Sequence, residues 1–199
     1  MKTTVITLSV LLVLVLLFQA FRYITKQQVE EQKFTVVKKY PEFEIRFYPS
    51  AILATVYSKA KTYKELAGPG FNKLAGYIFG GNDKEAKIAM TAPVRMDIND
   101  SNSSMSFVMP SNYSVENLPK PNNASVVVKK IPEEYVAVIK FGGYASDDDI
   151  KNYSKKLQKL LLENGILSHG NYRFLGYNPP FQIIGRRNEI IVCVDWKQQ

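Results

Sequence analysis

The strongest constraint on the fold is an internal repeat, because two parts of the chain show the same order of secondary-structure patterns 83 residues apart. Each half reads strand, helix, strand, strand. Identical residues are few, so the order of the patterns supports the repeat better than the residues do. We expect the halves to cover about 34–110 and 124–199, joined by a loop rich in Asn, Pro and Ser. At this offset the matching apolar positions are Ile52 with Tyr135, Ala54 with Ala137, Val56 with Ile139, Leu74 with Leu157, and Ile78 with Leu161.

The elements expected from local patterns are similar in the two halves. The first half has strands between 43 and 57, a helical window at 63–79 that Gly68-Pro69-Gly70 interrupts, and strands at 87–98 and 105–109. The second half has strands at 126–128 and 135–141, a helix opening at Ser146, and strands at 172–177 and 189–196. Ser146, followed by Asp149, is typical of a capping box. These halves predict an α+β domain with two helices on a curved or partly closed antiparallel sheet.

Residues 87–98, KIAMTAPVRMDI, have apolar side chains at every second position. This alternation indicates a strand with one face in the core, and it puts Arg95 on the other face. Met105, Phe107 and Met109 continue the pattern on the next strand, which makes the apolar surface soft and adaptable. We interpret this apolar surface as part of the hydrophobic core. The alternative is that it lines a ligand cleft. The apolar series is Ile88, Met90, Ala92, Val94, Met96 and Ile98.

The N-terminal segment is strongly apolar, since Val5–Phe21 contains no charged residue. A run of this length can cross the roughly 30 Å of hydrocarbon in a bilayer. We expect residues 1–24 to form an N-terminal transmembrane anchor, with a cleaved signal peptide as the alternative. A polar stalk at 25–33 and the folded domain at 34–199 follow. The expected localisation is a single-pass membrane protein, and for the domain we favour the extracytoplasmic side.

Charge and motif content narrow the classes of function. The formal charge is +8, but the basic residues are scattered in pairs, so nucleic-acid binding is not expected. Cys193 is the only cysteine and His169 the only histidine, which excludes an internal disulfide and a multi-histidine metal site. The sequence has no Gly-rich phosphate loop, no GxSxG and no HExxH. We therefore expect a non-enzymatic protein without a structural metal.

Three blocks of the sequence resemble the SOUL haem-binding protein family: EFEIRFYPSAILATV, KIAMTAPVRM and YNPPFQIIGRRNEIIV. The resemblance extends over about residues 34–196. It implies a distorted antiparallel β-barrel built from two pseudo-symmetric βαββ repeats with two flanking helices. It also implies that the domain binds haem or a related tetrapyrrole in an apolar cleft.

Haem binding makes specific demands on this sequence. The macrocycle requires a large apolar slot, the propionates require Arg or Lys, and the iron usually takes an axial side chain. Arg95, Arg186 and Arg187 are propionate candidates, although the last two are also suited to a turn before the final strand. His169 is a weak axial candidate. The cleft residues expected on this basis are Met90, Val94, Arg95, Met96, Phe107 and Arg186.

The resulting hypothesis is a membrane-anchored, non-enzymatic module that binds haem or another tetrapyrrole. One alternative is a module for another amphipathic small molecule, and a further one is a protein-interaction domain. A hydrolase is the remaining alternative, which would need a cleft acid such as Glu44 or Glu189 beside a tyrosine.

Overall fold

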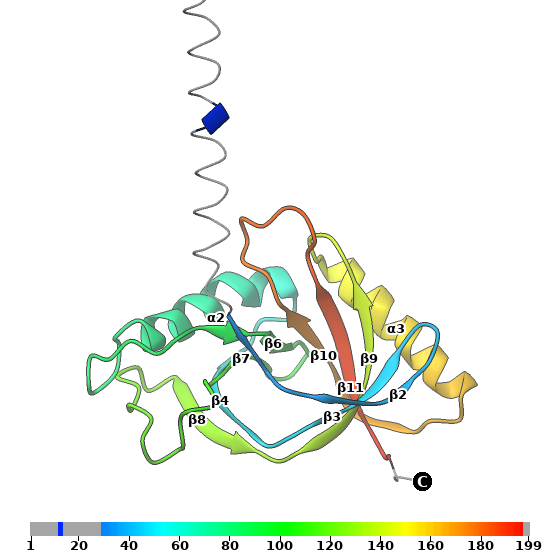
Figure 1. Cartoon of the computed structure of the whole chain (residues 1–199), viewed down its shortest axis with the longest axis horizontal. Coiled ribbons are helices and arrows are strands. Elements are labelled where there is room, and N and C mark those ends of the chain that lie inside the picture. Colours follow the sequence, from blue (N-terminus) through cyan, green and yellow to red (C-terminus); the bar gives the residue numbers. More distant parts are fainter. Residues whose placement is uncertain (1–11, 14–28, 197–199) are drawn as a thin grey trace, which may run out of the picture.

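The computed structural model describes residues 12–13 and 29–196. Two helices and one large antiparallel sheet make up most of the described chain (Figure 1). The first half contains β1 (Glu30–Glu31), β2 (Thr35–Lys39), β3 (Glu44–Tyr48), β4 (Ala51–Ser58), α2 (Tyr63–Ile78), β5 (Thr91–Ala92), β6 (Val94–Asp97) and β7 (Ser103–Val108). The second half contains β8 (Val126–Ile131), β9 (Glu134–Phe141), α3 (Asp147–Glu163), β10 (Ser168–Gly176) and β11 (Asn188–Val194).

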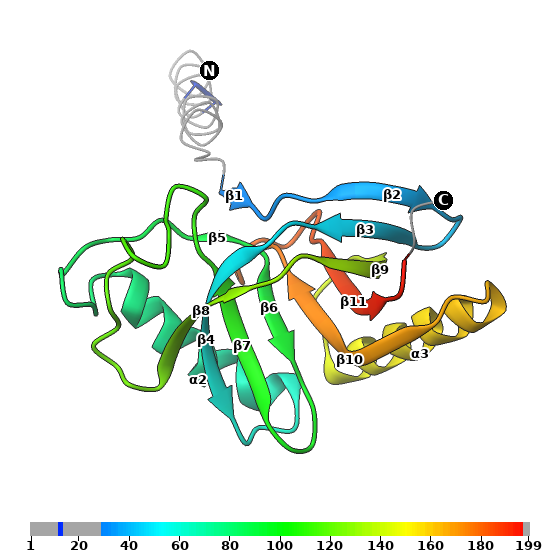
Figure 2. The same ribbon diagram turned by 90° about the horizontal axis from the view of Figure 1, so that it is seen from below.

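Nine strands form the sheet in the order β2-β3-β9-β11-β10-β6-β7-β4-β8 (Figure 2). Strands of the two halves pair with each other, because β3 pairs with β9 and β8 pairs with β4. β4 and β9 span 51–58 and 134–141, which are separated by the offset of the sequence repeat. Ala54 and Ala137 occupy matching positions on these strands, and both are fully buried. β1 pairs with β5 in a separate two-stranded ladder.

The expected barrel is not closed. Within the described chain β2 pairs only with β3, and β8 pairs only with β4, so the sheet has two open edges. Closure would require the two edge strands to pair with each other. The structure confirms the predicted α+β class with two helices and a large antiparallel sheet. The predicted β-barrel is wrong, because the sheet stays open.

Both helices cover the same face of the sheet, and the main core lies beneath them. Side chains directly opposite each other on paired strands share a face. One such row crosses five strands from β7 to β9, and all its members are buried. Leu74 of α2 and Leu157 of α3, which correspond in the repeat, are both 0% exposed. The row consists of Met105, Met96, Phe174, Ile190 and Ile139.

Helix α2 runs without a break through Gly68-Pro69-Gly70, contrary to the expected interruption. A Cβ atom at Gly70 would lie 3.2 Å from the Met105 side chain. Glycine at this position therefore lets the helix approach β7 closely.

The expected strand at 87–98 is divided into two short strands. Thr91–Ala92 form β5 and Val94–Asp97 form β6, with Pro93 between them after a cis peptide bond. Proline has no backbone N–H to donate to a neighbouring strand, which accounts for the division at this residue. Ile88, Ala92 and Met96 are nevertheless buried, as the alternation predicts.

The predicted single-pass membrane localisation is contradicted, because no helix in the described part of the chain is long and apolar enough to cross a membrane. The longer helix, α3, has 17 residues. At 1.5 Å per residue that is roughly 25 Å, shorter than the roughly 30 Å hydrocarbon core. The predicted span at 5–21 lies outside the described residues except for Leu12 and Val13. The expected boundaries of the N-terminal anchor (1–24), the polar stalk (25–33) and the folded domain (34–199) stay predictions.

Candidate functional site

Four of the seven residues selected from the sequence lie in the core beneath the helices, and Met96, at 6% exposed, is one of them. Met90 and Val94 are partly buried against this core, and Phe107 is 3% exposed. The ring of Phe107 meets that of Phe71 on α2 edge-on, with centroids 5.3 Å apart. These side chains hold α2 against the sheet.

Arg95 and His169 line a hollow of about 410 Å³ on the sheet face away from the helices. Strands β4, β6, β7 and β8 form one side of the hollow, and residues of β9, β10 and β11 form the other. The imidazole of His169 is 60% exposed, and its Nδ1 atom lies 3.5 Å from Asp195 Oδ1. The structure thus brings together two predicted residues, Arg95 and His169, that are far apart in the sequence.

Glu134 binds two guanidinium groups beside this hollow. Its Oε1 atom accepts hydrogen bonds from Arg95 Nη2 at 2.7 Å and Arg173 Nη1 at 3.2 Å. Its Oε2 atom accepts from Arg173 Nη2 at 2.7 Å and from the Cys193 thiol at 3.2 Å. Burial by itself raises the pKa of Glu134, but Arg173 and Arg95 outweigh this effect and hold the pKa at about 2. Burial, and then the charge of Arg173, lower the pKa of Arg95.

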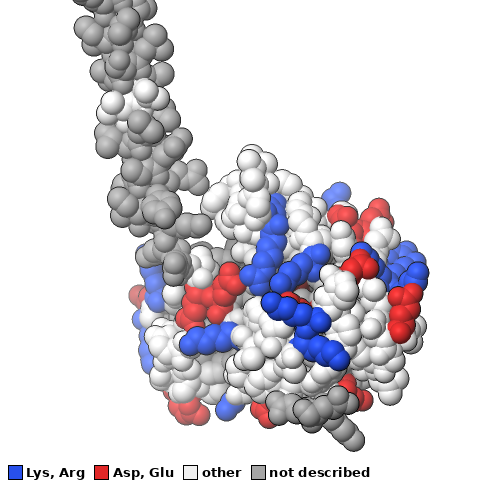
Figure 3. Space-filling view, turned by 45° about the vertical axis from the view of Figure 1, so that its right-hand side comes forward, with Lys and Arg blue, Asp and Glu red and all other residues white. Residues whose placement is uncertain are grey.

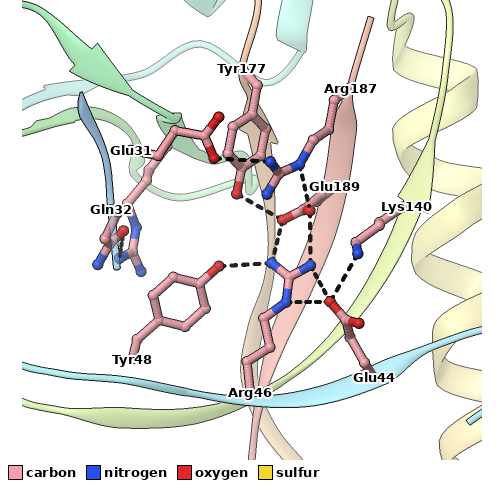
Figure 4. Close-up of polar contacts among 10 residues, drawn as sticks. Glu31, Gln32, Glu44, Arg46, Tyr48, Lys140, Tyr177, Arg187 and Glu189 are labelled. Atoms are coloured by element: carbon pink, nitrogen blue, oxygen red, sulfur yellow. Dashed lines mark hydrogen bonds and ion pairs between the residues drawn. The ribbon is translucent and has the colours of Figure 1, made fainter. Parts of the chain in front are cut away.

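A second polar cluster centres on Arg46 and Glu189, which form a bidentate ion pair at 2.8 and 3.0 Å (Figure 4). Tyr177 and Arg187 donate further hydrogen bonds to Glu189 at 2.8 and 3.0 Å. Arg46 also donates to the hydroxyl oxygen of Tyr48 at 3.0 Å. Burial raises the pKa of Glu189, but the hydrogen bonds and charge of Arg46 lead the effects that lower it overall.

This cluster contains the acid and tyrosine that the hydrolase alternative required. Both oxygens of Glu189, however, already accept hydrogen bonds from Arg46, Arg187 and Tyr177. Glu44, the other acid considered, is paired with Arg46 and Lys140. A general base must have a lone pair free to take a proton, so the arrangement of Glu189 suits strand-to-strand support better than proton transfer.

Arg186, the seventh predicted residue, lies in the β10–β11 loop, residues 177–187. Its guanidinium carbon lies 4.3 Å from the ring centroid of Tyr144. Its Nη1 atom donates to the carbonyl oxygens of Pro179 and Gln182, both at 2.8 Å. Its Nε atom is buried and has no hydrogen-bond partner among the described residues. The buried Nε donor of Arg186 is therefore unpaired among the described residues.

The same loop exposes three large apolar side chains. Phe181, Ile183 and Ile184 are 77%, 75% and 87% exposed. The loop is the uppermost part of the folded region in Figure 1, and Figure 3 shows an uncharged protrusion there with Lys and Arg side chains below it. Neighbouring exposed apolar groups of this size are typical of a contact surface.

Several residues of these sites were missed in the sequence. Phe181, Ile183 and Ile184 were detectable, because an apolar run follows two prolines in a segment with loop composition. Glu134 and Arg173 offered no such signal, because they are 39 positions apart and meet only through the sheet. Among the described residues, no group of three or more His, Cys, Asp or Glu side chains is arranged to hold a metal ion.

Comparison with known proteins agrees with the sequence resemblance. The family model described as SOUL heme-binding protein matches residues 29–193. Heme-binding protein 2 of Mus musculus is 30% identical over 156 residues, which cover 74% of this chain and 76% of the relative. Heme-binding protein 1 of Xenopus laevis is 28% identical over 155 residues, covering 74% and 81%.

A solved structure shares the fold at much lower identity. The C-terminal domain of EcmrR has a TM-score of 0.59 and 13% identity, with 77% of this chain and 97% of that chain covered. At such identity the likeness concerns the fold alone. The family model, in contrast, matches residues 29–193, which include both helices and nearly all of the sheet. The chain therefore belongs to the SOUL heme-binding protein family.

Proposed function

We propose that this protein binds haem or a related tetrapyrrole on the surface of the β10–β11 loop, without catalysing a reaction. The observation that carries the proposal is the exposure of Phe181, Ile183 and Ile184, which lie within four consecutive positions of one loop. A tetrapyrrole is a flat apolar ring, and covering it with such side chains removes apolar area from water on both partners. The names of the two relatives, both heme-binding proteins, support the same ligand.

The charge at this surface fits the carboxylates of a tetrapyrrole. Arg186 is held in place by its stacking on Tyr144 and by two carbonyl acceptors. Its buried Nε atom, which lacks a partner in the described part of the chain, is a donor that a propionate would satisfy. The Tyr144 hydroxyl donates to Pro180 O at 3.1 Å, which ties the loop to the β9–α3 connection. The apolar side chains would hold the ring and Arg186 a propionate.

The residues of the loop offer the iron no His, Met or Cys ligand. His169 lies near the start of β10, whereas the loop follows Gly176 at the end of this strand. Seven residues of strand separate the two places by about 20 Å. The proposal therefore rests on ring packing and charge, and assigns no iron ligand to His169.

Titration of the full-length chain with haemin tests the proposal. We expect saturable one-to-one binding with a shifted Soret band, and at least a tenfold loss of affinity in the double variant Ile183→Ser, Ile184→Ser. Leu162→Ser is the matched control, because Leu162 is 70% exposed on α3, outside the loop. Equal effects of the loop and control variants would contradict the proposed place. Unsaturable binding would favour another amphipathic ligand or a protein partner for this surface.

A further inference from the structure

The hollow on the face away from the helices is lined by polar groups. The hydroxyl oxygens of Thr55 and Ser106 lie 2.8 Å apart within it, and both residues are buried. At the rim, Lys129 Nζ donates to the hydroxyl of Tyr57 at 2.9 Å. An apolar macrocycle would leave these groups without water, at a cost in free energy. The hollow therefore suits a polar ligand.

Two guanidinium groups share a single carboxylate at this hollow. Arg95 is 5% exposed and the Arg173 side chain is 18% exposed, and both pair with Glu134. The oxygens of Glu134 accept two hydrogen bonds from Arg173, one from Arg95 and one from Cys193. One buried and one partly buried guanidinium group thus share a carboxylate whose acceptors are occupied. A guanidinium group has five N–H donors. Arg95 uses donors on its two Nη atoms for Gln32 and Glu134, and Arg173 uses donors on its two Nη atoms for Glu134, so both groups keep donors for a further acceptor.

The other charged groups around the hollow are of both signs, and Asp97 carries a negative charge that acts on Arg173. Lys129 and Glu133 are exposed at the rim and have opposite signs. The carboxylate of Asp97 accepts hydrogen bonds from Asn171 at 3.1 Å. His169 lies at the exposed edge beside Asp195. Charges in contact with water are screened by salt, whereas buried ones are screened much less.

We propose that the hollow binds a small polar oxyanion, a carboxylate or a phosphate, through Arg95 and Arg173. The fork of donors on a guanidinium matches two oxygens of such a group. The hydroxyls of Thr55, Ser106 and Tyr57 are available to hydrogen-bond the remainder of the ligand. A hollow of about 410 Å³ is within the range of small-molecule sites. The hollow shares no residue with the proposed tetrapyrrole surface, so either proposal can fail without the other.

The test is titration of the full-length chain with inorganic phosphate and with succinate at constant ionic strength, read by calorimetry and amide NMR shifts. We expect saturable binding of at least one anion, with the largest shifts in β6, β7 and β10. Glu134→Gln releases both guanidinium groups and should tighten binding at least tenfold. Arg173→Gln leaves Arg95 paired with Glu134 and should weaken binding at least tenfold. Comparison of the two titrations identifies the preferred oxyanion.

Lys155→Gln is the control, because Lys155 is an exposed cation on α3, away from the hollow. Its anion affinity should equal that of the unaltered chain. If a variant fails to fold, as judged by circular dichroism, the shift map of the unaltered chain decides. The proposal is overturned if neither anion gives saturable shifts in the hollow, or if Lys155→Gln weakens binding as much as Arg173→Gln. Tetramethylammonium tests the opposite charge. The proposal is also overturned if this cation binds in the hollow and binds more weakly to the Glu134→Gln variant.

Discussion

Arg46 and Glu189 lie 143 positions apart in the sequence, yet they form a bidentate ion pair in which both side chains are 0% exposed. Arg46 is on β3 and Glu189 on β11, with β9 between these strands in the sheet. The pair therefore ties together three strands that come from both halves of the chain. Arg187 and Tyr177 complete the hydrogen bonding of the carboxylate (Figure 4).

Removing this cation should be strongly destabilising. Arg46→Met leaves Glu189 buried without its bidentate partner, so we expect the free energy of unfolding to fall by about 3–5 kcal/mol. Lys140→Met is the control, since Lys140 is half exposed and its pair with Glu44 should contribute about 1 kcal/mol or less. Urea denaturation of both variants measures the difference. Losses of equal size would show that burial of the pair is not decisive.

Stability should fall in acid through Glu134, whose pKa is lowered from 4.5 to about 2 in the folded chain. Because the folded-state pKa is the lower one, the carboxylate stabilises the fold above about pH 4.5. That contribution is lost as the pH falls towards 2. A shift of this size corresponds to about 3 kcal/mol. Urea denaturation between pH 7 and 2 measures it.

The variant Glu134→Gln should be less stable than the unaltered chain at pH 7 and should lose less stability between pH 5 and 2. Glu163→Gln is the comparison, because the Glu163 side chain is 54% exposed at the end of α3. An acid dependence that is the same in Glu134→Gln as in the unaltered chain would assign the loss to other carboxylates.

Arg186 and His169 should differ in their effect on tetrapyrrole binding. Arg186→Gln removes the charge that the proposal assigns to a propionate, and a charge-assisted hydrogen bond of about 1.5–3 kcal/mol corresponds to at least a tenfold loss of affinity. His169→Ala should leave the Soret band and the affinity unchanged, because His169 lies at the far end of β10. Haemin titration of the two variants measures both effects. Loss of the Soret shift in His169→Ala would place the ligand at the hollow instead.

Alanine substitution at two glycines near the end of α2 should change the stability of the fold in opposite directions. A Cβ at Gly76, an exposed helical position, would have no neighbour within 4 Å, so Gly76→Ala should stabilise the fold by about 0.5–1 kcal/mol. A Cβ at Gly81 would lie 2.6 Å from the carbonyl oxygen of Gly76, so Gly81→Ala should destabilise by about 1–3 kcal/mol. Thermal unfolding distinguishes the two, and changes of the same sign would contradict this packing.

Local patterns predicted much of the secondary structure. Ser146 and Asp149 form the expected capping box at the start of α3, because this hydrogen bonding involves only neighbouring residues. The repeat correctly aligned β4 with β9, and alternation correctly placed Met96 in the core. A proline within a strand marks an edge or a bulge, and the structure has two short strands on either side of Pro93.

The candidate site was harder to predict from local sequence patterns. Alternation placed Arg95 on the face opposite Met96, but its burial against Glu134 depends on a strand from the other half of the chain. The expected cleft combined Phe107 of the core with Arg186 of a surface loop, since periodicity shows which face a residue occupies but not which element covers that face.

The sequence by itself determined the α+β class, the family and the starting point of α3, because alternation, capping and motif identity are properties of short segments. Only the tertiary structure decided that the sheet stays open, that Arg46 meets Glu189, and that two guanidinium groups share Glu134. These outcomes depend on strand order and register between distant segments. The free energy that selects them comes from burying many side chains together, and no short segment contains that information.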